Sequence, residues 1–274
     1  MSNWMKELNE EYPNYNTVGE TWVTEPAYTP GGRKTPSSPP AQQSLENSHG
    51  FSFFDKVNTA KNEQTDTWFK GLDRVYNNFV YDYLYPNPAS VLAFIENHDT
   101  DRFLGEGENL DMLKQASTLL LTTRRIPQLY YGTEVMMNGV KSKSDGYVRK
   151  DFPGGWADDK ENALTPEGRT RLQNESYNFY RNLLNWRKGN DVIAKGSMKQ
   201  FMVQHGVYAY ARQYKGKTVF VLLNGTDKEV KLPLKYYAEV LKDKTQGKDV
   251  ISGKVTALNE ELTMAPRQSM VIEL

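Results

Sequence analysis

The sequence has no cysteine, which excludes disulfide bonds and thiolate metal sites and leaves the cellular compartment open. Its three histidines, at positions 49, 98 and 205, are too scattered to predict a histidine zinc site, so neither a metal nor a cofactor is expected. No apolar run of about 18 residues is present, so no membrane span is predicted. Residues 1–6 lack a basic region followed by an apolar core, so no secretory signal is indicated.

An excess of one charge is also lacking, because 34 Lys and Arg residues balance 34 Asp and Glu residues. A balanced chain gives no electrostatic argument for binding nucleic acid or an anionic membrane surface. Aromatic residues are plentiful instead, with 17 Tyr, 11 Phe and 5 Trp. Flat amphipathic rings suit the faces of sugars, but they also suit ordinary cores, which is the better explanation for most of them.

Residues 90–132 show the pattern of a strand–helix–strand unit. Val91–Ile95 is a continuous apolar run, typical of a strand buried on both faces of a sheet. Leucines at helical spacing follow from Leu110 to Leu121, with Asn109 as the candidate cap, and residues 126–131 have the composition of the next strand. Such a unit implies a parallel sheet with a right-handed crossover, and therefore an α/β fold.

Periodicity and breaker residues predict further elements on either side of this unit. Helices are expected at residues 3–11, 63–83 and from Thr165 to about Lys188, strands at 16–23 and 51–54, and a proline-rich loop at 26–40. After Gly189, short strands separated by turn signals are expected at 201–203, 207–210, 218–223, 237–240 and 269–272. A chain of 274 residues has room for two domains, and we place them at residues 1–192 and 193–274.

Two carboxylates stand out by their position at predicted strand ends. Glu20 follows Val18 and Gly19, and Asp99 follows the apolar run that ends at Ile95. In barrels of parallel strands, side chains at the carboxyl ends converge on one mouth, where a pair of carboxylates can share acid and base work. On spacing alone, a surface or helix-capping role is the better explanation for both residues, because 34 acidic residues offer many accidental pairs.

Four segments change that weighting, because they resemble motifs of the α-amylase family in the family's order. The sequence FIENHD at residues 94–99 resembles the motif at the end of the seventh barrel strand, and GETW at 19–22 resembles that of the fifth. Residues 126–134 resemble the eighth strand and its turn, and FPGGW at 152–156 resembles a loop of neopullulanases and cyclomaltodextrinases. The resemblance implies an α/β fold, the C-terminal half of a (β/α)8 TIM barrel with strands five to eight, followed by a small antiparallel β-sandwich domain.

The resemblance also implies roles for individual residues. Glu20 matches the general acid/base, and Asp99 matches the third carboxylate, which binds sugar hydroxyls and stabilises the oxocarbenium-like transition state. His98 matches an imidazole that hydrogen-bonds the same sugar, and Trp22 is expected as an apolar wall. Arg102 is expected either to line the same mouth and bind substrate, or to be a structural residue that holds Asp101 or Glu106.

The sequence departs from the family in two places. The family's nucleophilic Asp lies upstream of the position of Glu20, and residues 1–19 contain no Asp. The proline-rich stretch before His49 is a poor match to the sixth strand. The expectation is therefore a C-terminal fragment that is inactive alone, because a retaining glycosidase needs a nucleophile about 5–5.5 Å from its acid.

The resemblance implies a retaining hydrolase of α-1,4-glucosidic bonds, and its expected partner is an α-glucan such as a starch-derived oligosaccharide, pullulan or a cyclodextrin. No nucleic acid partner is expected, the full-length form is a candidate homo-oligomer, and the family suggests a periplasmic or extracellular location. Two alternatives stay open. One is a non-catalytic carbohydrate-binding or partner protein that retains half of the barrel. The other is a truncated product, whose open sheet edges make aggregation the expected result.

Overall fold

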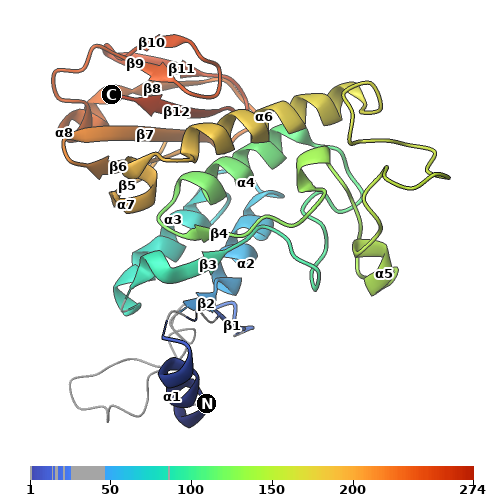
Figure 1. Ribbon diagram of the computed structural model, residues 1–274. Coiled ribbons are helices and arrows are strands. Elements are labelled where there is room, and N and C mark those ends of the chain that lie inside the picture. Colours follow the sequence, from blue (N-terminus) through green and yellow to red (C-terminus); the bar gives the residue numbers. More distant parts are fainter. Residues whose placement is uncertain (1, 14, 16–17, 21, 26–46, 86) are drawn as a thin grey trace.

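The computed structural model describes residues 2–13, 15, 18–20, 22–25, 47–85 and 87–274 (Figure 1). The predicted loop at 26–40 lies outside these residues, as does part of the strand predicted at 16–23. None of the helices in the described ranges is long and apolar enough to cross a lipid bilayer.

The first half of the chain forms a four-stranded parallel sheet in the order β1-β2-β3-β4. Its strands are short: β1 (Val18–Gly19), β2 (Asn47–His49), β3 (Val91–Ala93) and β4 (Ile126–Pro127). β1 was expected to be longer, and β2 falls where the sixth strand was in doubt. The parallel pairing of β3 with β4 across an intervening helix confirms the strand–helix–strand prediction.

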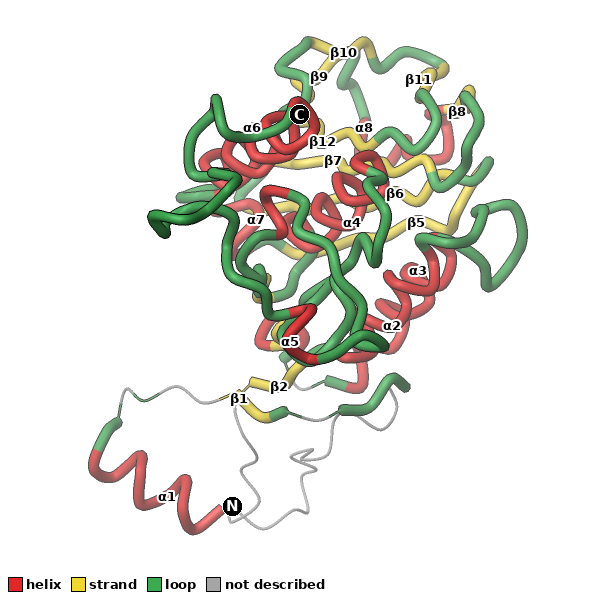
Figure 2. The backbone as a smooth tube through the Cα atoms, turned by 90° about the vertical axis from the view of Figure 1, so that its right-hand side faces the viewer, coloured by secondary structure: helices red, strands yellow, loops and turns green. Residues whose placement is uncertain are grey.

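Ten helical segments precede the C-terminal sheet in the described residues. They are α1 (Ser2–Glu11), α2 (Phe51–Ala60), α3 (Leu72–Val80), η2 (Tyr81–Leu84), η3 (Pro88–Ser90), α4 (Leu110–Thr122), η4 (Thr133–Val135), α5 (Asp145–Val148), α6 (Arg171–Arg187) and α7 (Asp191–Lys195). Asn109 caps α4 as predicted, because its side chain accepts a hydrogen bond from the Met112 N–H. α1 lies at the end of the molecule farthest from the C-terminal sheet (Figures 1 and 2).

The C-terminal region is built from antiparallel sheets, as the sequence predicts. A six-stranded sheet has the order β10-β9-β12-β7-β6-β5, and a two-stranded sheet pairs β11 with β8. The elements are β5 (Ser197–Gln204), β6 (Val207–Tyr214), β7 (Lys217–Asn224), β8 (Val230–Pro233), η5 (Leu234–Tyr237), α8 (Ala238–Leu241), β9 (Gln246–Asp249), β10 (Val255–Ala257), β11 (Glu261–Met264) and β12 (Ser269–Glu273).

Two predicted strands are wrong. Residues 51–54 open α2, where Phe53 and Val57 lie one turn apart and are both buried in the core. Residues 237–240 lie at the end of η5 and in α8, and there the buried residues Tyr237 and Val240 are three positions apart. In both cases a short apolar run fitted either period, and its tertiary contacts selected the helix.

The start of α6 also differs from the prediction. The helix begins at Arg171 rather than near Thr165, and Thr170 is its N-cap. The Thr170 hydroxyl accepts a hydrogen bond from the Gln173 N–H at 3.2 Å, and the Gln173 side chain accepts one from the Thr170 N–H at 2.8 Å. This reciprocal capping box satisfies N–H groups that the helix end leaves unpaired.

Thr170→Ala should therefore destabilise the chain by about 1 kcal/mol, because the alanine cannot accept the hydrogen bond from Gln173. Urea unfolding measures the change. Thr165→Ala is the matched control, because the Thr165 hydroxyl accepts a hydrogen bond from the Gly168 N–H in an exposed turn before the helix. Equal losses in the two variants would contradict the assignment of the cap.

The six-stranded sheet has a core on each face. One core joins α2, α3, α4 and α6 to inward residues of β6 and β7, so it is continuous from the α/β part into the C-terminal part. The other lies between the same sheet and the β8–β11 ribbon with η5 and α8. Figure 1 shows α6 running across the sheet beside α4. The helices thus fix the C-terminal sheet against the parallel sheet.

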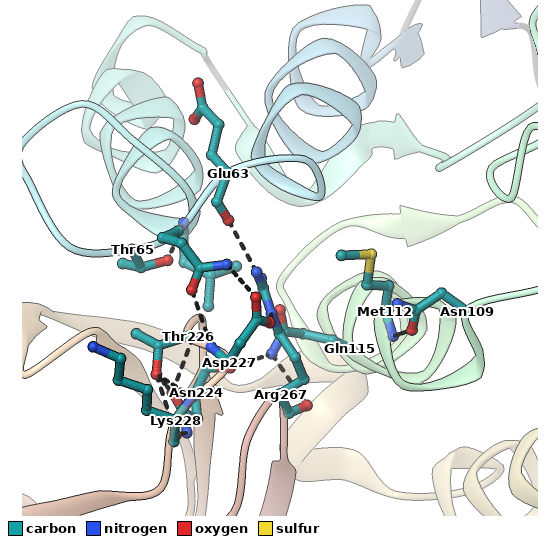
Figure 3. Close-up of polar contacts among 12 residues, drawn as sticks. Glu63, Thr65, Asn109, Met112, Gln115, Asn224, Thr226, Asp227, Lys228 and Arg267 are labelled. Atoms are coloured by element: carbon teal, nitrogen blue, oxygen red, sulfur yellow. Dashed lines mark hydrogen bonds and ion pairs between the residues drawn. The ribbon is translucent and has the colours of Figure 1, made fainter. Parts of the chain in front are cut away.

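Figure 3 shows one of the groups of hydrogen bonds that join the two parts. The Arg267 side chain donates from Nε to Asp227 at 2.6 Å and from Nη2 to the Glu63 carbonyl at 3.2 Å. The Thr65 N–H donates to the Gly225 carbonyl at 3.0 Å, and Gln115 donates to the Asn224 carbonyl at 2.9 Å. The predicted boundary at residue 193 falls within α7, and the division at 192/193 stays a prediction.

Candidate active site

The four parallel strands end at a common edge, because parallel strands present their carboxyl ends on the same side of a sheet. Glu20 follows β1 directly and is exposed. The segment of residues 94–99 follows β3, and Tyr130 and Tyr131 follow β4. The edge therefore carries both predicted carboxylates, on the loops that follow β1 and β3, with β2 between these two strands.

Aromatic rings connect the first three loops of this edge. Trp22 stacks on Phe51 with ring centroids 4.4 Å apart, and Phe51 meets Phe94 edge to face at 5.0 Å. Phe51 and Phe94 are buried, whereas the Trp22 side chain is 54% exposed. An indole held from beneath with one face open is a suitable wall for the apolar face of a sugar.

A tight turn presents His98 and Asp99. The Asn97 N–H donates to the Thr100 hydroxyl at 3.0 Å, and the Asp99 N–H donates to the Asn97 side-chain oxygen at 2.9 Å. Asn97 and Thr100 are buried, while the His98 side chain is 58% exposed. The buried polar residues thus fix the turn that projects its two functional candidates outward.

The Asp99 carboxylate lies between two nitrogen groups. Arg149 donates from Nη2 to its Oδ1 at 2.7 Å, and the His98 Nε2 lies 3.2 Å from its Oδ2. Arg149 also donates from Nε to the His98 carbonyl at 2.8 Å, and Lys141 donates to the Asp99 carbonyl at 2.9 Å. A carboxylate fixed in this way is suited to bind hydroxyl groups and to stabilise a developing positive charge.

A buried ion pair lies beneath the turn. Glu96 is 2% exposed and accepts hydrogen bonds from the Arg102 guanidinium at 3.2 Å, from the Thr133 hydroxyl and from the Phe103 N–H. Burial raises the pKa of the Glu96 carboxyl, and the hydrogen bonds and the Arg102 charge oppose that effect.

The Arg102 guanidinium also contacts residues of two other loops. It donates to the carbonyls of Tyr131 at 2.6 Å and Val148 at 3.0 Å, and it lies 3.9 Å from the centroid of the Tyr130 ring. The side chain therefore ties the loops after β3 and β4 to α5. Among the residues that the structure describes, no group of three or more acidic or imidazole side chains is placed to hold a metal ion.

Known proteins are similar to this chain in sequence and in fold. A family model described as the cyclo-malto-dextrinase C-terminal domain matches residues 198–273. An α-amylase from Niallia circulans is 29% identical over 217 residues, which cover 76% of this chain and 37% of the relative. A cyclomaltodextrin glucanotransferase from Thermoanaerobacterium thermosulfurigenes is 32% identical over 174 residues, 64% of this chain and 21% of the relative.

Solved structures extend the likeness along the chain. The α-amylase from Geobacillus thermoleovorans, solved with acarbose, matches with a TM-score of 0.75 at 18% identity over 99% of this chain and 56% of that chain. The chain is therefore similar in sequence to members of the α-amylase family over most of its length. CldA, a cyclomaltodextrin glucanotransferase, gives a TM-score of 0.74 at 19% identity over 99% of this chain and 52% of that chain. The chain thus spans about half of these solved proteins and less of the curated relatives.

The structure brings four of the five predicted α-amylase-family site residues to one edge. His98 and Asp99 are in contact, Trp22 reaches their loop through Phe51 and Phe94, and Glu20 lies two residues before Trp22. Their catalytic and binding roles stay predictions.

The structure corrects the predictions made for Arg102. Its side chain is fully buried and pairs with Glu96, so it does not line the exposed mouth. It does not hold Asp101 or Glu106 either, because Glu106 pairs with Lys143 and Asp101 accepts from the Lys141 N–H. The physical reason is that Glu96, inside the recognised motif, points into the core and requires a buried cation.

Arg149 is the residue that sequence reasoning missed. It lies fifty positions after Asp99 and contacts both that carboxylate and the His98 carbonyl. Its position close to residues 152–156, which carried part of the resemblance to the family, was the only signal in the sequence. The sequence did not show that this loop folds back onto the turn of residues 97–100.

Proposed function

We propose that this edge is part of the active site of a retaining α-glucan hydrolase of the neopullulanase or cyclomaltodextrinase type. Its substrates would be α-1,4-glucosidic bonds in starch-derived oligosaccharides, pullulan or cyclodextrins. The observation that carries the proposal is the Asp99 carboxylate, held between Arg149 and His98 at the carboxyl end of β3. An α-amylase relative and solved complexes with acarbose and maltose support the substrate class.

In this proposal Glu20 donates its proton to the glycosidic oxygen as the bond to the sugar breaks. It then takes a proton from the water that attacks the sugar. Asp99 binds sugar hydroxyls and stabilises the positive charge that develops on the ring, His98 hydrogen-bonds the same sugar, and Trp22 packs against the apolar face of the sugar ring.

The covalent step needs a third carboxylate as nucleophile. In the family's order it precedes Glu20, and residues 1–19 of this sequence contain no Asp. We therefore propose that residues 1–274 bind glucan without turnover unless a further part supplies the nucleophile. A chain that binds, does not hydrolyse and stays monodisperse would also fit the alternative of a carbohydrate-binding protein.

The domain assignment belongs to the same proposal. Residues 1–192 would supply strands five to eight of a (β/α)8 barrel, and residues 193–274 a small β-sandwich. The parallel order β1-β2-β3-β4 supports the first part, and the facing six-stranded and two-stranded sheets support the second.

Asp99→Ala should weaken binding of maltotriose to the chain by at least about tenfold, because a charged hydrogen-bonding group contributes about 1.5–3 kcal/mol. Isothermal titration calorimetry measures the affinity, and the release of reducing sugar from maltotriose should stay at background. Asp158→Ala is the matched control, since Asp158 is exposed and lies on a different loop. Equal affinity of Asp99→Ala and the unchanged chain would refute the site.

A further inference from the structure

A hollow lies between the α/β part and the C-terminal sheet. Its volume is about 270 Å³, and residues of α4, α6 and the turn after β9 line it. None of the five predicted active-site residues lines it. Binding sites commonly occur at such junctions, and the volume lies near the lower end of small-ligand pockets, about 300 Å³.

The rim of the hollow carries two amides without partners. Asn178 and Asn182 are one helical turn apart on α6, so they lie on the same face of the helix. Both are exposed, and neither side chain hydrogen-bonds to any residue in the described part of the chain. Each amide offers N–H donors and a carbonyl acceptor, a combination that matches vicinal hydroxyl groups.

The charges at the rim are already neutralised. Lys114 on α4 donates to the Glu175 carboxylate at 2.5 Å, and this hydrogen bond lowers the pKa of Glu175. Arg171 Nη1 lies 3.6 Å from the other Glu175 oxygen, but Arg171 does not line the hollow. The two charged residues that do line it carry no net charge together, and they still present hydrogen-bonding atoms. The hollow therefore suits a neutral polar ligand better than a phosphate or a carboxylate.

The floor is apolar and one wall is rigid. Phe179 and Ile251 line the hollow, and Phe179 is 7% exposed. Buried Asp249 fixes the turn that carries Ile251: its carboxylate accepts from the Ser252 hydroxyl at 2.6 Å and from the Ile251 N–H at 3.3 Å. A wall held in this way needs little ordering when a ligand binds.

We propose that this hollow is a second α-glucan site, which takes one glucose unit of an oligosaccharide at the junction of α4, α6 and the C-terminal sheet. The amides and the ion pair hydrogen-bond the ring hydroxyls, and the apolar floor packs against the C–H face of the ring. The choice of an α-glucan rests on the proposed function. The hollow then binds a glucan independently of the candidate active site, with which it shares no lining residue.

The test is a titration of the isotope-labelled 274-residue chain with maltotriose, followed by NMR. Saturable shifts are expected at the Asn178 and Asn182 side-chain amides, and separately at His98 in the candidate active site. The double variant Asn178→Ala/Asn182→Ala should weaken the response of neighbouring Phe179 and Ile251 about tenfold, which is ~1.4 kcal/mol, and leave the response of His98 unchanged.

Asn185→Ala is the matched control, because Asn185 is an exposed asparagine on the same helix that does not line the hollow. It should bind as the unchanged chain does. Shifts at His98 without shifts at the hollow would overturn this inference and leave the proposed function intact. Shifts at the hollow without shifts at His98 would support this inference and count against the proposed active site. Equal shifts with glycerol at matched hydroxyl concentration would show a general solvent effect and overturn the second site.

Discussion

Glu20→Gln should lower the hydrolysis of maltotriose by about 10²–10⁴-fold once residues 1–274 follow, in one reading frame, an upstream barrel half that carries the family's nucleophile. Glutamine keeps the shape of the side chain, but it has no proton to give to the glycosidic oxygen and accepts none from water. Initial rates of reducing-sugar release measure the loss. The same extended chain with Glu20 intact should hydrolyse the substrate, whereas residues 1–274 alone should not.

A change of substrate separates the acid role from a folding defect. An aryl maltoside has a leaving group that needs little protonation, so Glu20→Gln should lose less activity on its first, bond-breaking step than on maltotriose. Glu11→Gln, in exposed α1, is the matched control and should keep full activity on both substrates. Undiminished hydrolysis by Glu20→Gln would remove the acid/base assignment. Equal losses on the two substrates would attribute the effect to structure instead of proton transfer.

Local signals in the sequence predicted the parts of the fold that depend on neighbouring residues. The apolar run that begins at Val91 became β3, and the asparagine before Leu110 became the cap of α4. The contact of His98 with Asp99 also follows from adjacency in the chain. These features need no knowledge of the rest of the fold, because their hydrogen bonds and burial are set within a few positions.

Contacts between distant segments could not be predicted in the same way. Residues 51–54 are a short apolar run that fitted a strand or a helix, and the packing of Phe53 against Phe79 and its neighbours selects the helix. Arg149 reaches Asp99 because α5 turns back toward β3, and no spacing in the sequence encodes that path. The support of Trp22 by Phe51 likewise depends on the parallel pairing of β1 with β2.

Arg102 shows how a residue near a motif can be misassigned. An arginine three positions after Asp99 had two plausible directions, toward the mouth or into the protein. The deciding fact is the orientation of Glu96, which points inward although it stands in the same motif as the exposed His98. A buried carboxylate requires a cation or several hydrogen-bond donors, and Arg102 is the cation that the chain provides.

Arg102→Met should accordingly destabilise the chain by about 3–5 kcal/mol, because it leaves the Glu96 carboxylate buried without its cation. It also removes the hydrogen bonds to the carbonyls of Tyr131 and Val148, which join three loops beneath the candidate active site. Urea unfolding monitored by tryptophan fluorescence measures the free energy of unfolding. Arg171→Met is the matched control: Arg171 is 84% exposed, so its loss should change stability by less than about 0.5 kcal/mol.

The pH dependence gives the cause of the effect. Burial already raises the pKa of Glu96 in the folded chain, and removal of the Arg102 charge raises it further. For a carboxyl group whose folded-state pKa is raised, the relative stability is highest below the unfolded pKa, about 4.3, and falls as pH rises through the folded value. The loss of stability caused by Arg102→Met should therefore be smaller near pH 4.5 than at pH 7.

The double variant Arg102→Met/Glu96→Gln should lose less stability than the sum of the two single losses. If Arg102→Met keeps its stability at pH 7 and loses affinity for maltotriose, the structural role is wrong and Arg102 binds substrate instead.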